Sequence, residues 1–405
     1  MNFISLRSLL KPLLFWSVVI VISCEVMLHY KLKDLPYKFL NHTTGLIHKL
    51  GQYSKKEVIP KNYLAIIGDS NVYGYGPWLY DNSWSMEQPS FAPNHLLYSA
   101  LNQDVVSFGY PGFGSFGSTI HMVGELKTLQ SSWMWSKIED PQEILFVFYE
   151  GNDLINNLHE VQQRGLDLNA SLDLHITKKL KKVFTKAEIK LSEETSWRDH
   201  SASWNLFSGL TKNYWKKFFP EKRKLFDSDL DPSEKSMGSL NKTQNSVSNL
   251  AIINGKEREL GFSEGPALLL SVEEINLSLK ITEHSLSYLK SNFPNSRISV
   301  VYLPSSLSIY RFEDCELSPA PLDIWGGKRN GLFKPIDAKE KNLLIRKNLS
   351  KITCSLGFAF IDCTEYLQQQ SNSHLLHGPR DPIHLNRLGY ESFANAIYSY
   401  LNSRS

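Results

Sequence analysis

Residues 63–70 read Tyr63-Leu64-Ala65-Ile66-Ile67-Gly68-Asp69-Ser70, and this stretch decides which fold the rest of the chain is expected to have. Its first five residues are an apolar run bounded by polar residues, which is typical of a fully buried parallel strand. The run stops at Gly68-Asp69-Ser70 and continues into a loop with glycines at 74 and 76. Ser70 is therefore predicted at the carboxyl end of a strand, the edge at which open α/β sheets bind ligands.

Four more apolar runs follow at the spacing of an α/β protein: Asp104–Phe108, Ile144–Tyr149, Ile298–Leu303 and Phe358–Ile361. Helical patterns accompany them at Ser118–Leu129, Val272–Asn292, Ala338–Ser355 and Arg387–Leu401. Strands that alternate with helices in this way imply a parallel sheet covered on both faces. The sequence therefore predicts an α/β fold, a three-layer αβα sandwich around a five-stranded, parallel, flavodoxin-like sheet with a helical insertion.

Glycine and polar residues follow these strands in four groups. They are Ser70 after the first strand, Gly112 after the second, Gly151-Asn152-Asp153 after the third, and Asp381-Pro382-Ile383-His384 beyond the fifth. Carboxyl ends of parallel strands meet at one edge of the sheet, so all four groups are expected at one place. Polar groups in unrelated surface loops would rarely all fall at the carboxyl ends of strands.

The residue types in these groups suit nucleophilic catalysis. A serine hydroxyl becomes a good nucleophile only when a base takes its proton, and the base needs a third group to fix its tautomer. Asp381 and His384 are three residues apart across Pro382, a spacing that favours a turn in which the carboxylate reaches Nδ1 of the imidazole. Nε2 then remains to face Ser70.

The developing oxyanion of such a reaction needs preset hydrogen-bond donors, each typically worth ~3–4 kcal/mol of barrier. The candidates are the backbone N–H groups of Ser70 and Gly112 and the side-chain amide of Asn152. Glycine suits position 112 because no Cβ obstructs the approach of a substrate.

The four groups, in this order, resemble the sequence blocks of the SGNH (GDSL-type) esterase and acyltransferase family. The resemblance implies Ser70 as nucleophile, Gly112 and Asn152 in the oxyanion hole, and Asp381 with His384 completing a triad. It covers the sheet, its helices and the site, but neither the N-terminal segment nor the insertion. One departure is Ser107, where many members of the family carry asparagine.

Three functions remain open on these residues. The first is a serine esterase or deacylase that removes an acyl group, often acetyl in this family, from a glycan or lipid. The second is an O-acyltransferase that passes the same acyl group to a sugar hydroxyl. The third is a membrane-tethered binding module that keeps the fold without turnover. None of the three requires a cofactor.

Two other patterns have competing interpretations. Gly112 to Gly117 fits G-x-G-x-x-G after a strand, but the acids with the spacing of a dinucleotide site, Glu139 and Asp140, precede the next strand instead of ending it. The residues His374, His377, Asp381 and His384 could form a metal cluster, yet Gly378-Pro379 breaks any single helix face through them. We expect neither a nucleotide nor a metal.

The composition is that of an enzyme-sized globular protein. The chain has 405 residues, 42% hydrophobic residues and a formal net charge of +3, which indicates no nucleic acid partner. Its four cysteines are too few for a disulfide scaffold. One disulfide among Cys315, Cys354 and Cys363 is compatible with a body outside the cytoplasm, and the sequence does not choose the pair.

The N-terminus resembles a membrane anchor. Basic residues precede an uncharged run from Pro12 to Cys24, which Glu25 interrupts. The uncharged run suits a signal-peptide core, whereas spanning a bilayer takes about 17–25 apolar residues. We expect residues 1–30 to be an uncleaved anchor with the body on the periplasmic or extracellular side. The alternative is a lipoprotein, because Val21-Ile22-Ser23-Cys24 resembles a lipobox that would lipidate Cys24.

The remaining chain divides into a stalk over 31–60 and a catalytic domain over 61–405 with an insertion at 155–270. The part from His175 to Lys224 carries 13 Lys+Arg and 5 Asp+Glu, a net charge of 13 − 5 = +8. Apolar residues recur in it at helical intervals, from Leu180 through Val183, Phe184 and Ala187. This pattern fits either a solvated helical cap or a helix that faces an anionic membrane. Residues 227–265 have the composition of a mobile loop.

Overall fold

The computed structural model describes residues 6–35, 46–76, 90–132, 138–166, 176–194, 197–218, 249–261, 263–313, 316–324, 327–378 and 381–404. Within these residues the centre of the molecule is a five-stranded sheet of order β10-β6-β3-β1-β2. The strands are β1 (Leu64–Gly68), β2 (Val105–Gly109), β3 (Glu143–Tyr149), β6 (Arg297–Leu303) and β10 (Ala359–Asp362). Every pairing in this sheet is parallel. The predicted flavodoxin-like sheet is therefore confirmed.

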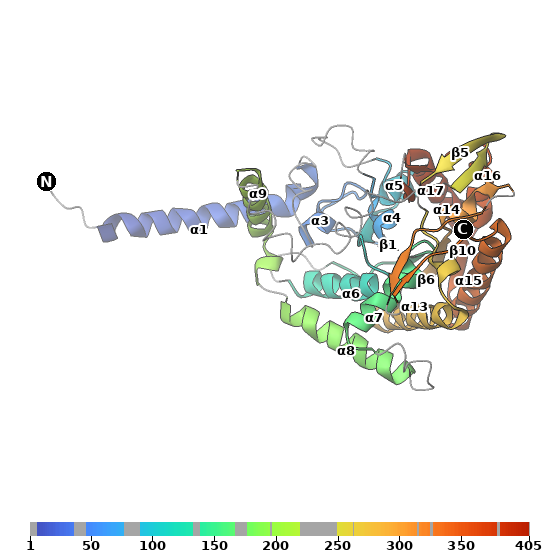
Figure 1. The fold of residues 1–405 in the computed structure, drawn as a ribbon. Helices are drawn as coiled ribbons and strands as arrows, with labels where there is room; N and C mark the ends of the chain where they lie inside the picture. The colour runs from blue at the N-terminus through green and yellow to red at the C-terminus, as the bar shows by residue number, and fades with distance from the viewer. Residues whose placement is uncertain are drawn as a thin grey trace.

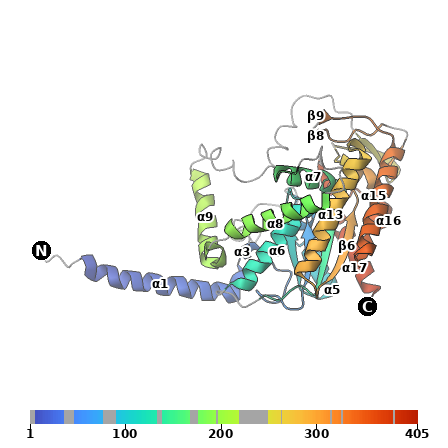
Figure 2. The same cartoon turned by 90° about the horizontal axis from the view of Figure 1, so that it is seen from below.

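Helices cover both faces of the sheet and complete the three layers (Figures 1 and 2). One face carries α6 (Ser115–Ser131), α7 (Asp153–Gln163), α13 (Val272–Asn292) and α15 (Pro335–Ser355). The other carries α5 (Pro93–Leu101), α16 (Thr364–Ser371) and α17 (Arg387–Asn402). The helices predicted from periodicity correspond to α6, α13, α15 and α17, with ends that differ by at most three residues.

The sheet is buried on both faces because alternate side chains of each strand enter different cores. In β1, Ala65 and Ile67 belong to the core under α6 and α13, whereas Leu64 and Ile66 belong to the core under α5 and α17. This double burial explains the uninterrupted apolar runs from which the strands were predicted.

The stalk expected over residues 31–60 is not what the structure shows for its second half, residues 46–60. After α3 (Leu46–Leu50), the chain runs beside β2. Gln52 donates to the carbonyl of Ser107 at 2.8 Å and accepts from its N–H at 2.8 Å, and the backbone N–H of Val105 donates to Ser54. Residues 46–60 therefore pack against β2 and belong to the domain. They do not form the free stalk that was expected.

The insertion begins with α7 and continues through α8 (Ile176–Glu194), a short 3-10 helix (Trp197–His200) and α9 (Ala202–Phe218). The apolar stripe predicted in it lies on α8. Leu180, Val183 and Phe184 are buried against the domain, and Phe184 packs edge-on against Phe116 of α6. This helix is thus a cap whose lysine-rich face is turned away from the core.

The end of the insertion corrects the prediction of a mobile loop over 227–265. Two strands, β4 (Asn249–Ile253) and β5 (Lys256–Leu260), form an antiparallel hairpin there. Asn254 and Gly255 connect them with φ angles of 51° and 68°, the geometry of the favoured two-residue hairpin turn. The Asn-Gly pair after the apolar run Leu250-Ala251-Ile252-Ile253 is the sequence signal for this hairpin. Residues 227–248 lie outside the described part of the chain, as does Cys315.

Candidate active site

Ser70 lies where β1 ends and the short helix α4 (Ser70–Tyr73) begins. This tight strand-to-helix turn depends on close backbone contact between neighbouring segments. A Cβ at Gly109, the last residue of β2, would come within 2.3 Å of the backbone nitrogen of Tyr73. Gly74 ends α4 in the left-handed conformation with φ 79°. These glycines allow α4 to cross the sheet edge and place the Ser70 hydroxyl above it.

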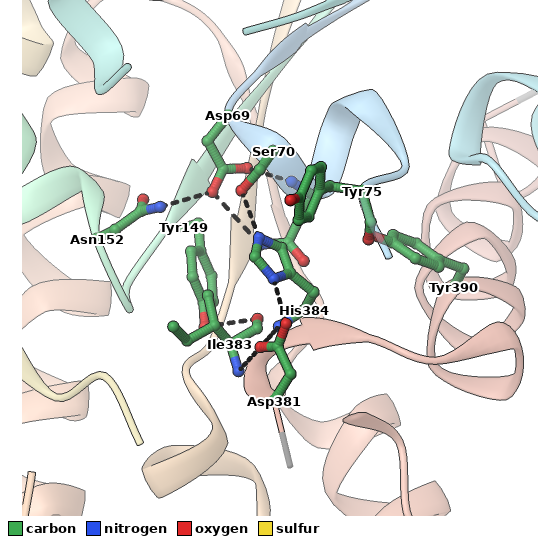
Figure 3. Close-up of polar contacts among 10 residues, drawn as sticks. Asp69, Ser70, Tyr75, Tyr149, Asn152, Asp381, Ile383, His384 and Tyr390 are labelled. Atoms are coloured by element: carbon green, nitrogen blue, oxygen red, sulfur yellow. Dashed lines mark hydrogen bonds and ion pairs between the residues drawn. The ribbon is translucent and has the colours of Figure 1, made fainter. Parts of the chain in front are cut away.

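Ser70 and two side chains from the distant segment Asp381–His384 form a continuous hydrogen-bonded series (Figure 3). Nε2 of His384 lies 2.9 Å from Oγ of Ser70, and Nδ1 lies 2.9 Å from Oδ2 of Asp381. An ionised carboxylate can only accept, so Nδ1 carries the proton and Nε2 is left to accept from the serine hydroxyl. The exposed fractions are only 6–8% for all three residues, so the series is shielded from bulk water.

The carboxyl group of Asp381 is held by its own chain segment. Asp381 starts β12 (Asp381–Leu385), and its Oδ1 accepts the backbone N–H groups of Ile383 at 3.0 Å and His384 at 3.2 Å. Burial by itself raises the pKa of Asp381, but the hydrogen bonds from His384 and from the two backbone groups lower it below the ordinary aspartate value. The carboxylate is thus charged at neutral pH and faces the imidazole.

Asn152 and Asp69 form a second pair beside Ser70. The side-chain amide of Asn152 donates to Oδ2 of Asp69 at 2.9 Å, and Asn71 donates to the same carboxyl group through its backbone and side chain. Burial raises the pKa of Asp69 although these hydrogen bonds lower it. The contact holds the Asn152 amide at the sheet edge, with one of its two N–H groups engaged.

Gly112 lies after β2 in an exposed turn, with φ 82°. Among the described residues, one set of hydrogen bonds joins Ser70, His384 and Asp381, and a second joins Asp69, Asn71 and Asn152. Of the predicted oxyanion donors, the amide of Asn152 is held by Asp69, and Gly112 lies in the turn that follows β2.

Aromatic side chains that were not predicted as part of the site support it. Tyr149, the last residue of β3, donates to the carbonyl of Ile383 at 3.1 Å and so holds the segment before His384. A Cβ on Gly151 would lie 2.3 Å from the Tyr149 ring, which explains the glycine in Gly151-Asn152-Asp153. On the other side, the Tyr75 ring packs on the imidazole with centroids 4.7 Å apart.

A further carboxyl group from the end of the insertion borders the site. Glu264 follows the hairpin, and its Oε2 is buried with no hydrogen-bond partner among the described residues. Burial raises the pKa of Glu264 to about 8, and the charges of Asp69 and Asp381 act in the same direction. No periodicity or motif marked this residue, because its role depends only on where the insertion returns to the sheet.

The glycine loop has no room for a phosphate group. Both carboxylate oxygens of Glu160, from α7, accept backbone N–H groups at the start of α6, from Gly114 at 2.7 Å and Gly117 at 2.7 Å. An anion of the protein itself therefore occupies the donors that a dinucleotide would need.

The histidines of the alternative metal cluster are also separated. His377 is buried, and its Nδ1 lies 2.9 Å from the Tyr310 hydroxyl, so this nitrogen is engaged within the protein. Within the described residues, no three His, Cys, Asp or Glu side chains form a group that could hold a metal ion. The side chains at this edge are arranged for proton transfer between a hydroxyl and an imidazole.

Neither a protein family model nor a curated protein matches this chain. Among solved structures, a phospholipase A1 from Streptomyces albidoflavus is similar over 85% of this chain and 100% of its own, with 12% identity and a TM-score of 0.37. An acetyl xylan esterase from the rumen bacterium Butyrivibrio proteoclasticus is similar over 85% of this chain and 65% of its own, with 12% identity and a TM-score of 0.33.

Proposed function

We propose that this chain is a serine esterase or deacylase that cleaves O-acyl esters through an acyl-enzyme. The observation that carries the proposal is the unbroken series of 2.9 Å hydrogen bonds from Ser70 through His384 to Asp381. A nucleophile, a base and a group that orients the base are the three parts that acyl transfer requires.

In the proposed reaction, Oγ of Ser70 attacks the ester carbonyl while Nε2 of His384 takes the hydroxyl proton. Asp381 stabilises the imidazolium that forms, and the oxyanion receives hydrogen bonds from Ser70 N–H, Gly112 N–H and the second N–H of the Asn152 amide. His384 then gives the proton to the leaving alcohol. Water, deprotonated by His384, attacks the acyl-enzyme and releases the carboxylic acid and the free serine.

The substrate class that we propose is an acylated glycan or lipid close to a membrane. The support is α1 (Leu6–Lys31), which projects from the body (Figure 1). Within the described residues it is the one helix long and apolar enough to cross a bilayer, and only 6% of its most apolar window is buried. We propose that α1 is an uncleaved anchor and that the domain lies outside the cytoplasm. Lipidation at Cys24 is the alternative, and the mass of the mature chain distinguishes the two.

Covalent labelling with a fluorophosphonate tests the activated serine without knowledge of the substrate. We expect one phosphonyl adduct, mapped to Ser70, and none in Ser70→Ala. Ser308→Ala is a matched control, because that serine is similarly buried but donates to the carboxylate of Glu150 at 2.9 Å instead of an imidazole. Absence of a Ser70 adduct in the folded protein would leave the binding module as the better interpretation.

Transfer to a sugar hydroxyl uses the same residues, so only the fate of the acyl group separates it from hydrolysis. The acyl-enzyme formed from p-nitrophenyl acetate is allowed to partition between water and an added oligosaccharide. Release of acetate alone at high oligosaccharide concentration supports the deacylase, whereas acetylated oligosaccharide supports the transferase.

A further inference from the structure

Helix α9 makes an unusual contact with the anchor helix. Glu25, the acid that interrupts the apolar run of α1, accepts four hydrogen bonds from the first residues of α9. The donors include the backbone N–H groups of Ala202 at 2.7 Å and Ser203 at 3.0 Å, and the hydroxyl of Ser201 at 3.0 Å. A carboxylate at a helix N-terminus is favoured by the helix dipole. The contact therefore fixes the start of α9 at the level of Glu25 along α1.

The geometry of α1 puts that level near a bilayer surface. Among the side chains that the structure describes on α1, the large apolar ones from Leu13 to Met27 are mostly exposed, and Tyr30 is 71% exposed. Leu28 and Leu32 are buried in the domain core. Because α1 enters the body at Leu28, a bilayer that surrounds the exposed apolar residues up to Met27 must approach the body closely. Glu25 and the start of α9 then lie at the membrane–water boundary.

Two faces of α9 differ in what they contact. Ala202 and Gly209 are buried, and Leu206 packs against the domain core. On the opposite side of the helix, Trp204 is 40% exposed and Phe207 is 65% exposed. Figure 2 shows α9 running across the direction of α1, so a bilayer spanned by α1 would lie alongside α9.

The segment that contains α9 is basic. From His175 to Lys224 it carries 13 Lys+Arg and 5 Asp+Glu, a net charge of 13 − 5 = +8. Exposed aromatic side chains on a helix of a basic segment are typical of helices that lie in the interface of an anionic membrane.

We propose that α9 lies in the headgroup region of the bilayer that α1 enters. Trp204 and Phe207 then insert into the lipid, and Glu25 holds the two helices together. The occupant of this face is lipid, because the start of α9 is bonded to Glu25, between the exposed apolar residues Ile22 and Val26 of α1, and its segment is basic. The inference rests on the proposed anchoring of α1, and the body would then be held against the membrane at two places.

Spin labels in the full chain test the proposal, in nanodiscs of phosphatidylcholine and phosphatidylglycerol. Cys24, Cys315 and Cys354 are first replaced by serine, and Cys363 is kept because it is buried. Single cysteines are then introduced as Phe207→Cys, as Val21→Cys on α1, and as Leu343→Cys on α15. Leu343 is the matched control, since it is 59% exposed on a helix at the other end of the molecule.

We expect the label at 207 to collide with oxygen several-fold more than with a water-soluble nickel chelate, as the label at 21 does, while the label at 343 shows the reverse. A label at 207 that behaves like the one at 343 overturns the proposal while the anchor stands. Water exposure at both 21 and 207 removes the anchor and the inference together, without affecting the labelling of Ser70. Protection at 207 from both reagents, with spin–spin broadening, indicates a second copy of the chain and also refutes the lipid assignment.

Discussion

Replacing Asp381 with asparagine tests whether the hydrogen-bonded series is catalytic. The asparagine side chain would keep an oxygen for the backbone N–H groups of residues 383 and 384, which Oδ1 of Asp381 accepts at 3.0 and 3.2 Å. At the Oδ2 position, however, an NH₂ group would face Nδ1 of His384 instead of an acceptor 2.9 Å away. The imidazole would then carry its proton on Nε2 and could no longer accept from Ser70.

The expected size of the effect follows from this change of tautomer. The same substitution in other Ser-His-Asp enzymes lowers turnover about 10⁴-fold, equivalent to about 5.5 kcal/mol of barrier. Folding should suffer less, because one charged hydrogen bond is lost at a cost of about 1.5–3 kcal/mol. The pKa of Asp381 is lowered by folding, so its contribution to stability is present above the ordinary aspartate pKa and is lost as the pH falls through the lower folded value.

The assay is steady-state hydrolysis of p-nitrophenyl acetate by the purified full chain, with urea unfolding of each variant. Asp337→Asn serves as the control, because Asp337 also accepts a backbone N–H, that of Lys334 at the start of α15, but does not bond to an imidazole. We expect the control to keep its activity. If Asp381→Asn is folded and turns over within tenfold of the wild type, His384 is not oriented by this carboxylate and the catalytic reasoning is wrong.

Three other substitutions test the surroundings of Ser70. Asn152→Ala should lower turnover by ~10²–10³ in a protein that still folds, at a cost in stability of about 1–3 kcal/mol for the lost hydrogen bond to buried Asp69, and an unchanged rate would remove Asn152 from the oxyanion hole. Glu264→Gln should reduce the fall in the free energy of unfolding between about pH 5 and 9. Folding raises the pKa of Glu264 from 4.5 to about 8, so this group stabilises the fold at low pH and loses that contribution as the pH rises through 8. Equal slopes of urea midpoint against pH in the variant and the wild type would contradict this. Gly109→Ala should destabilise the protein by about 1–3 kcal/mol and slow the labelling of Ser70, since its Cβ meets the backbone of Tyr73 at 2.3 Å; a wild-type labelling rate would show that α4 does not depend on this contact.

Local sequence was sufficient wherever a short segment carries its own signal. The β1 run predicted a strand because parallel strands are buried on both faces, and Gly68-Asp69-Ser70 marked its end. Asp381 and His384 were paired from a spacing of three, since a carboxylate can reach an imidazole across one turn. The hairpin at Asn254-Gly255 belongs to this class as well, because its two-residue turn forms in spite of the polar composition around it, which favoured a loop.

Tertiary structure alone decided the contacts between segments that are distant along the chain. The pairing of Asn152 with Asp69, the position of Glu264 beside the site, and the capture of Glu25 by α9 join residues more than 80 positions apart. No periodicity encodes such contacts, because they arise only when the sheet order and the path of the insertion bring their elements together. The sequence by itself determined which side chains follow the strands at the sheet edge, because each lies at the end of a short local segment, and the packing of the insertion and the anchor determined what surrounds them.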